Sequence, residues 1–175
     1  MPSNDQIILD QIVEGQRLAR FPSANKSDFF EIYVAEQALK DFDVSDEEIE
    51  SGLVGGGGDG GIDAIYTFTN GDLVREDHDH ESLKKNLLIE VIIISAKTSP
   101  TFDEDSMNKL IAVTNDLFDL ARPVDDFKRV YNEGVRSAVD LFRQLYFKVA
   151  NRFPRLHFRY ISTLQGGTGG TFTPT

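Results

Sequence analysis

Asp63, Ser95 and Lys97 are polar residues in two segments whose other residues predict buried strands. Asp63 is the first charged residue of segment 62–69, where apolar and small residues alternate with the period of a strand. Lys97 ends segment 87–97, whose nearly continuous apolar run is typical of a strand buried on both faces. Ser95 shares the face of Lys97, because side chains two residues apart point the same way. A buried cation is costly unless an anion faces it, so we expect Asp63 or a bound phosphodiester beside Lys97.

Glu31 is a further candidate, because it lies on the apolar stripe of a predicted helix. It precedes Val34, Ala35 and Ala38 by three, four and seven residues, which places all of them on one helix face. The carboxylate is therefore expected to face inward. A single buried glutamate is more often a paired structural residue, and Asp63 alone more often caps a turn. The case for a site rests on the three charged residues together.

Two other acidic residues are alternatives. Glu36 has Lys40 four residues later, which is the orientation of an ordinary surface ion pair, so Glu36 is the fallback for Glu31. Asp59 lies four residues before Asp63 in a glycine-rich segment. It could assist as an alternative metal ligand, and solvation of the loop explains it equally well.

Two motifs contain residues typical of binding sites, but their sequence context favours a structural explanation. The glycine-rich segment 55–61 invites a phosphate-binding interpretation, but such loops need a helix directly after the glycines, and here a strand pattern follows. We expect a turn instead. The segment 77–81, Asp-His-Asp-His-Glu, contains metal-binding groups, but closely spaced ligands in a polar stretch are typical of a solvated hairpin tip.

The elements that must position these residues follow from periodicity. Helices are expected at 5–20, from Ser27 or Asp28 to Leu39, from a Thr101–Glu104 capping box onward, and at 125–151. Strands are expected at 62–69, at 87–97 in the centre of the sheet, and at 156–162, with a hairpin at Asn70-Gly71. The apolar stripe of the helix after the capping box comprises Met107, Leu110, Ile111, Leu117 and Phe118. The core face of the last helix comprises Phe127, Tyr131, Ala138, Phe142, Leu145 and Val149, with Gly134 as an interior residue. The order predicts an α/β or α+β protein with a small mixed sheet.

The composition excludes several classes of protein. The 175 residues, 40% of them hydrophobic, are expected to form one domain over residues 1–163, with a Gly/Thr-rich tail or linker at 164–175 that suggests a longer chain. The longest apolar run, broken by Glu90, is too short to cross a bilayer, so no membrane partner is expected. Without cysteine or a signal-peptide pattern, a cytoplasmic location fits best.

The charge of −11 disfavours a nucleic-acid partner at first sight, but the basic residues are unevenly distributed. Residues 121–175 hold nine of the 18 basic residues and four of the 29 acidic ones. Within them Arg129, Arg136 and Arg143 recur every seven residues on one face of the predicted long helix. We expect this row either to contact nucleic-acid phosphates or to be a solvated helix face.

Three segments together resemble a known family: 30–39 (FEIYVAEQAL), 58–64 (GDGGIDA) and 92–98 (IIISAKT). They are similar to the signature segments of the PD-(D/E)XK, or restriction-endonuclease-like, nuclease superfamily, near Mrr-like nucleases and the N-terminal region of abortive-infection phage-resistance (AIPR) proteins. The resemblance covers about residues 25–163. It implies an α/β restriction-endonuclease-like fold, with a mixed central sheet of four or more strands flanked by helices.

The resemblance also implies a function. Glu31 and Asp63 would bind Mg²⁺, with Mn²⁺ as a substitute, and Lys97 would position or activate the attacking water. The expected activity is hydrolysis of phosphodiesters in nucleic acid, by analogy double-stranded DNA, by an endonuclease of bacterial restriction or anti-phage defence. A homodimer and a further C-terminal domain are compatible with it.

Position 95 departs from the family pattern. The family places Glu or Gln there, whereas this chain has Ser95, whose hydroxyl is a shorter ligand for a hard cation such as Mg²⁺. The rival interpretation is therefore a catalytically inactive nuclease-fold domain that serves nucleic-acid binding or assembly. A nucleotide-sensing domain is a third interpretation, supported only by the glycine-rich segment.

Overall fold

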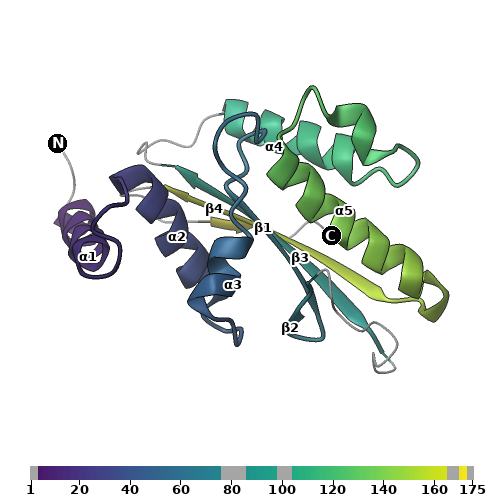
Figure 1. The fold of residues 1–175 in the computed structure, drawn as a ribbon, viewed down its shortest axis with the longest axis horizontal. Coiled ribbons are helices and arrows are strands. Elements are labelled where there is room, and N and C mark those ends of the chain that lie inside the picture. Colours follow the sequence, from purple (N-terminus) through teal and green to yellow (C-terminus); the bar gives the residue numbers. More distant parts are fainter. Residues whose placement is uncertain (1–3, 76–85, 98–103, 165–169, 173–175) are drawn as a thin grey trace.

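The protein is an α/β structure in which a mixed five-stranded sheet lies between two layers of helices (Figure 1). The computed structural model describes residues 4–75, 86–97, 104–164 and 170–172. The expected Thr101–Glu104 capping box and the histidine-containing segment 77–81 lie outside these residues. Within the described ranges no helix is long and apolar enough to span a membrane.

The sheet has the strand order β2-β1-β3-β4-β5, and β3 (Leu88–Lys97) is its centre, as predicted. β3 pairs antiparallel with β1 (Ala64–Thr69) and parallel with β4 (Arg155–Leu164). β1 and β2 (Asp72–Leu73) form the hairpin predicted from Asn70-Gly71. β5 (Gly170–Phe172) pairs antiparallel with β4, so part of the expected tail is an edge strand and not a linker.

One face of the sheet is covered by α1 (Asn4–Arg20), α2 (Lys26–Leu39) and α3 (Asp46–Ser51). The N-cap of α2 is Asn25, whose side chain accepts a hydrogen bond from the Asp28 backbone N–H, and not Ser27 or Asp28 as expected. The core on this side comprises Phe29, Phe30, Leu39, Phe68 and Ile92, among others. Burial of these aromatic and aliphatic side chains fixes α2 against β1 and β3.

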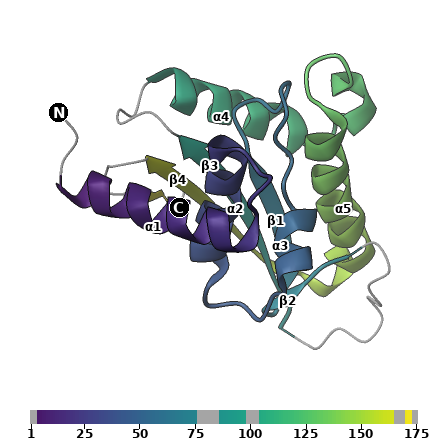
Figure 2. The same ribbon diagram turned by 60° about the vertical axis from the view of Figure 1, so that its left-hand side comes forward.

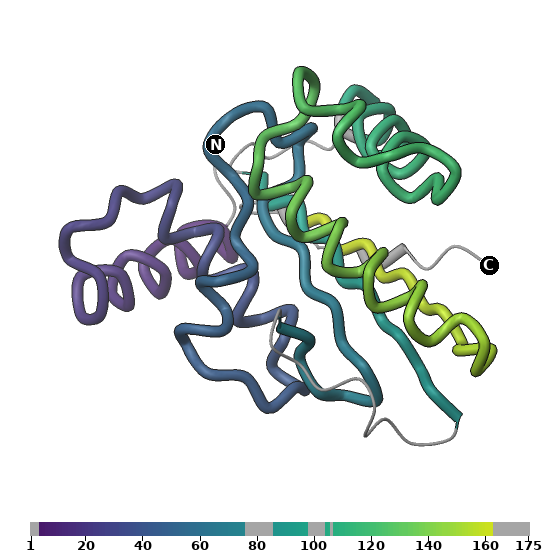
Figure 3. Tube along the Cα trace, turned by 45° about the vertical axis from the view of Figure 1, so that its right-hand side comes forward, coloured from purple at the N-terminus to yellow at the C-terminus, as the bar shows by residue number. Residues whose placement is uncertain are grey.

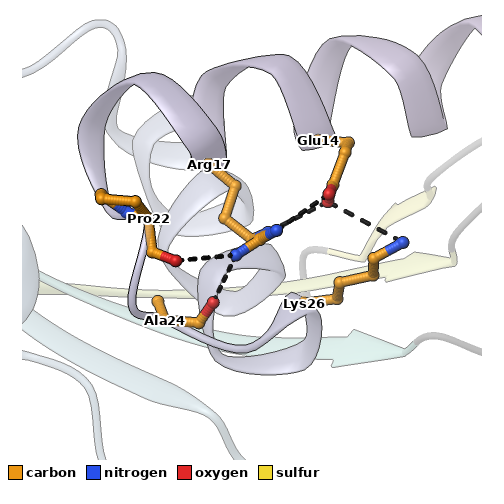
Figure 4. Close-up of polar contacts among 5 residues, drawn as sticks. All are labelled: Glu14, Arg17, Pro22, Ala24 and Lys26. Carbon is orange, nitrogen blue, oxygen red and sulfur yellow. Dashed lines mark hydrogen bonds and ion pairs between the residues drawn. The ribbon is translucent and has the colours of Figure 1, made fainter.

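α1 is attached mainly to α2 and crosses in front of it in Figure 2. Its Arg17 forms an ion pair with Glu14 at 2.8 Å and donates a hydrogen bond of 2.7 Å to the Ala24 carbonyl, as Figure 4 shows. Lys26, the first residue of α2, approaches the same Glu14 carboxylate at 3.9 Å. These contacts hold the turn between the two helices, and thereby the start of α2.

The other face is covered by α4 (Glu104–Leu117) and α5 (Glu133–Val149). The prediction of one long helix over 125–151 is wrong. The segment instead contains a short 3-10 turn at Val124–Phe127 and the separate helix α5. Asn132 causes the break: its side-chain oxygen accepts from the Val135 N–H, and its amide donates to the Val54 and Gly57 carbonyls. Gly134 therefore lies in the first turn of α5.

The predicted core positions on this face are confirmed with one exception. Ile111 of α4 is 51% exposed. The remaining members of the two stripes are buried or pack against the core, namely Met107, Leu110, Leu117, Phe118, Phe127, Tyr131, Ala138, Phe142, Leu145 and Val149.

Candidate functional site

The carboxyl end of β3 is the place where three elements bring polar side chains together. Asp63 directly precedes β1, and its backbone N–H donates a 2.9 Å hydrogen bond to the Ile94 carbonyl. One of its carboxylate oxygens, Oδ2, accepts a 2.6 Å hydrogen bond from the Ala96 N–H. Asp63 is thus held beside the last residues of β3, where Ser95 and Lys97 lie. Glu31 approaches from α2.

The carboxyl of Asp63 is half-buried, and it interacts with the charges of Asp59 and Lys97. Its pKa is raised to about 6, mainly because burial disfavours the charged form; the hydrogen bond from the Ala96 N–H opposes this rise, the negative charge of Asp59 adds to it, and the Lys97 ammonium opposes it. Lys97 and Asp63 are therefore close enough for electrostatic attraction, as the sequence predicted.

The carboxyl of Glu31 likewise has a raised pKa. Burial, followed by the negative charges of Asp63, Asp28 and Asp59, raises the pKa of Glu31 to about 7. Two partly buried carboxyls, on α2 and before β1, thus repel each other when both are ionised. Such a pair favours either a proton or a cation between its members.

The glycine-rich loop forms the wall beside Glu31. A Cβ atom added at Gly55 would lie 3.0 Å from Glu31 Oε2, so the absence of a side chain leaves room for the carboxylate. The tube in Figure 3 shows the loop passing beside the start of α5. It is fixed there because the Asn132 N–H donates to the Gly58 carbonyl, and the Asn132 side-chain amide donates to the Val54 and Gly57 carbonyls. The expected turn is confirmed, and it is anchored at both sheet and helix.

Ser95 is 1% exposed, and its hydroxyl faces the Tyr160 phenol. Ser162, its partner in the parallel β3–β4 register, is also buried, and its Oγ makes no hydrogen bond within the described structure.

Tyr160 of β4 is a site residue that sequence reasoning missed. It packs near Ser95 and within electrostatic range of Asp63: burial and the Asp63 charge raise the pKa of its phenol, while the nearby Ser95 lowers it. The segment 156–162 was predicted as a strand, but its parallel pairing with β3 is a long-range contact. Only that pairing brings Tyr160 opposite Ile93 and beside Ser95.

The two alternative acids have different positions. Glu36 forms a 2.6 Å ion pair with Arg20 of α1, and not with Lys40, so it holds α1 to α2 outside the site. Asp59 accepts a 2.7 Å hydrogen bond from the Gly61 N–H within the loop, and its charge acts on both Glu31 and Asp63. Asp59 therefore lies at the border of the site.

The prediction that Arg129, Arg136 and Arg143 lie on one face of a single helix is wrong. Arg129 precedes α5 and is exposed, and Arg136 donates to the Tyr131 carbonyl and lies 3.8 Å from Asp125. Arg143 is 6% exposed, and its guanidinium donates to the carbonyls of residues 117, 120 and 122. Its role is to hold the segment after α4 against α5, so the three arginines do not form one phosphate-contacting surface.

The donor set at the end of β3 fits a hard cation. Glu31, Asp63 and the Ser95 hydroxyl are oxygen donors, which Mg²⁺ and Mn²⁺ prefer, and Mg²⁺ commonly uses one or two carboxylates with water in its other positions. The described part of the chain contains no group of three or more His, Asp or Glu residues arranged to hold a metal ion.

Comparisons with known proteins identify no relative: no family model matches the chain, and searches of curated proteins and of solved structures find no match.

Proposed function

We propose that the carboxyl end of β3 hydrolyses phosphodiesters in nucleic acid, with double-stranded DNA as the substrate, as in restriction or anti-phage nucleases of the PD-(D/E)XK type. The observation that supports the proposal is electrostatic: the charge of Asp63 acts on the partly buried Glu31 carboxyl, and the charge of Lys97 acts on Asp63, which is bonded to the end of the central strand. Two carboxyls and an ammonium group are the side chains that this reaction requires.

Each residue has a defined task in this proposal. Glu31 and Asp63 would hold Mg²⁺, which would supply charge neutralisation at the phosphoryl oxygens and a more acidic water. Lys97 binds a non-bridging oxygen of the phosphodiester and stabilises the charge that develops there. The Ala96 N–H fixes Asp63 Oδ2, which leaves Oδ1 for the cation.

A second candidate function is nucleic-acid binding or assembly without catalysis. It is favoured by one observation, namely that position 95 provides a buried serine and that no third carboxylate joins Glu31 and Asp63 among the described residues. Loss of one ligand weakens the site for Mg²⁺ more than for the more tolerant Mn²⁺.

Cleavage of supercoiled plasmid DNA, compared with a structured RNA, tests the proposed function. We expect nicking in Mg²⁺ that is faster in Mn²⁺, abolished by a chelator, and lost in Lys97→Ala. Lys148→Ala is the matched control, because Lys148 is an exposed lysine in the last turn of α5. Absence of cleavage in either metal, or equal cleavage by Lys97→Ala, would favour the second function.

Ser95→Gln sharpens the choice between the two functions. A longer side chain at position 95 restores an oxygen on the face of Lys97, but it must displace the neighbouring Tyr160 ring. We therefore pair Ser95→Gln with the double variant Ser95→Gln/Tyr160→Phe. Higher metal affinity and faster cleavage in either variant support catalysis, whereas folded variants that bind no metal argue for a binding domain.

A further inference from the structure

We infer that Lys109 of α4 is a second phosphate-binding residue, which acts with Lys97 on the nucleic-acid backbone. This inference rests on the proposed function and extends it to the path of the substrate strand. Lys109 belongs to a helix that contributes nothing to the residues identified from the sequence.

Gly61 is the point where the two lysines meet. A Cβ atom added at Gly61 would lie 3.9 Å from Lys97 Nζ, 3.6 Å from Lys109 Cδ and 3.9 Å from Lys109 Cβ. Gly61 has a φ of +82°, which favours glycine. The glycine therefore allows the side chains from β3 and α4 to approach the same side of the loop, two residues before Asp63.

α4 holds Lys109 in a defined place. The neighbouring Leu110 and Val113 are buried in the core, and a Cβ added at Gly60 would lie 2.4 Å from Val113 Cγ2. The loop and the helix are thus in close contact through small and apolar groups. Packing of this kind fixes the helix, while the exposed Lys109 side chain stays accessible from solvent.

Both ammonium groups are available for an anion. In the described ranges neither lysine forms an ion pair, although Asp105 lies one turn before Lys109 on α4. The first two thirds of the chain are strongly acidic. Two lysines beside Gly61 are therefore a local exception, and they offer a cationic contact for adjacent phosphates of one strand.

The chemistry of the lysine side chain predicts which part of the nucleic acid Lys109 binds. A lysine is a flexible point charge and suits phosphate oxygens better than base edges, so Lys109 is expected to bind the backbone of any sequence. Its contribution belongs to substrate binding. Lys97 contributes mainly to the chemical step.

The test is the salt dependence of binding to a short fluorescent DNA duplex in the absence of divalent metal. For Lys109→Gln we expect weaker binding and a log–log salt slope reduced by about 0.9, the value for one lost phosphate contact. Lys109→Arg should keep the wild-type slope. Lys148→Gln, a lysine on the far helix α5, should change neither quantity.

Steady-state cleavage provides the second measurement. Lys109→Gln should raise KM with little change in kcat, whereas Lys97→Ala should lower kcat, and a merely structural role of Lys109 would instead lower the thermal midpoint. An unchanged salt slope and KM in Lys109→Gln, with cleavage still dependent on Lys97, would overturn the inference and leave the proposed function intact. Wild-type protein that neither binds nor cleaves DNA would overturn both.

Discussion

The two ends of β3 differ in how completely their polar groups are satisfied. At the amino end, Asn70 closes the strand: its side chain accepts a hydrogen bond from the Leu88 N–H, and its backbone N–H donates to the Leu88 carbonyl. From Val91 to Ile94 every side chain is buried in one of the two cores. At the carboxyl end, Glu31 and Asp63 are partly buried carboxyls with raised pKa values, and the Lys97 ammonium acts on Asp63.

This difference separates residues that stabilise the fold from residues that reduce its stability. The hydrophobic middle of β3 contributes burial on both faces, and natural proteins tolerate unfavourable polar groups mainly where function requires them. Partly buried carboxyls that repel each other at one end of an otherwise well-packed strand are therefore expected of a binding site. Substitutions in the middle of the strand should mainly lower stability, whereas substitutions at the carboxyl end should mainly affect binding and activity.

The largest expected effect is on stability, in the middle of the strand. Ile92→Ala removes a fully buried side chain between α2 and the sheet and should lower the free energy of unfolding by roughly 2–5 kcal/mol. Lys97→Ala should lower it by less than about 1 kcal/mol, because it leaves no large buried cavity. Urea denaturation measures both. A Lys97→Ala loss as large as that of Ile92→Ala would contradict the proposed division.

The next effect concerns Arg143, which the structure assigns to the scaffold. Arg143→Gln removes hydrogen bonds from a buried guanidinium to carbonyls of the segment after α4, and should cost about 1–3 kcal/mol. Arg129→Gln, at an exposed position, should stay within about 0.5 kcal/mol of wild type. Equal unfolding free energies for the two variants would show that Arg143 does not hold the segment.

A pH dependence is expected from Glu31. Its pKa in the folded protein is about 7, above the ordinary value of 4.5, so the protonated form favours folding. This stabilisation is complete below the unfolded pKa and is lost as the pH rises through the folded pKa. Metal-free wild type should therefore lose stability relative to Glu31→Gln between about pH 5 and about pH 8.

Thermal unfolding across this pH range measures the difference, with Glu47→Gln on the exposed face of α3 as the control. The control should follow the wild-type curve. Parallel curves for wild type and Glu31→Gln would mean that the Glu31 carboxyl is not in a repulsive environment.

The smallest expected effect is at the loop. Gly55→Ala places a methyl group 3.0 Å from Glu31 Oε2, so the carboxylate must shift by a few tenths of an ångström. We expect a stability change below about 1 kcal/mol but weaker Mn²⁺ binding. Gly15→Ala, at an open position of α1, should raise stability by about 0.5–1 kcal/mol without affecting the metal. Unchanged Mn²⁺ affinity in Gly55→Ala would separate the loop from the site.

Local patterns in the sequence were sufficient for most of the elements. The helix at 5–20, the hairpin and the central strand follow from periodicity and turn residues, and the inward position of Glu31 follows from its stripe. The break at Asn132 was missed because Phe127 and Tyr131 keep a helical spacing across it. The cap became visible only through its bonds to Val54 and Gly57, far away in sequence.

The same limitation explains the site residues that were misplaced or missed. The seven-residue spacing of the arginines has structural meaning only if one helix spans all of them, and it does not. Tyr160 and Lys109 reach the end of β3 through a parallel strand pairing and a helix–loop contact. Neither contact leaves a periodic signal in the sequence.

The most direct test of a cation site at the end of β3 is Mn²⁺ binding, followed by the loss of the free-ion electron paramagnetic resonance signal at about pH 8, where both carboxyls are ionised. We predict saturable binding of one ion per chain in wild type. Binding should be lost in Asp63→Asn and kept in Asp72→Asn, an exposed aspartate on β2. Equal binding by wild type and Asp63→Asn, or none by wild type, would contradict the account.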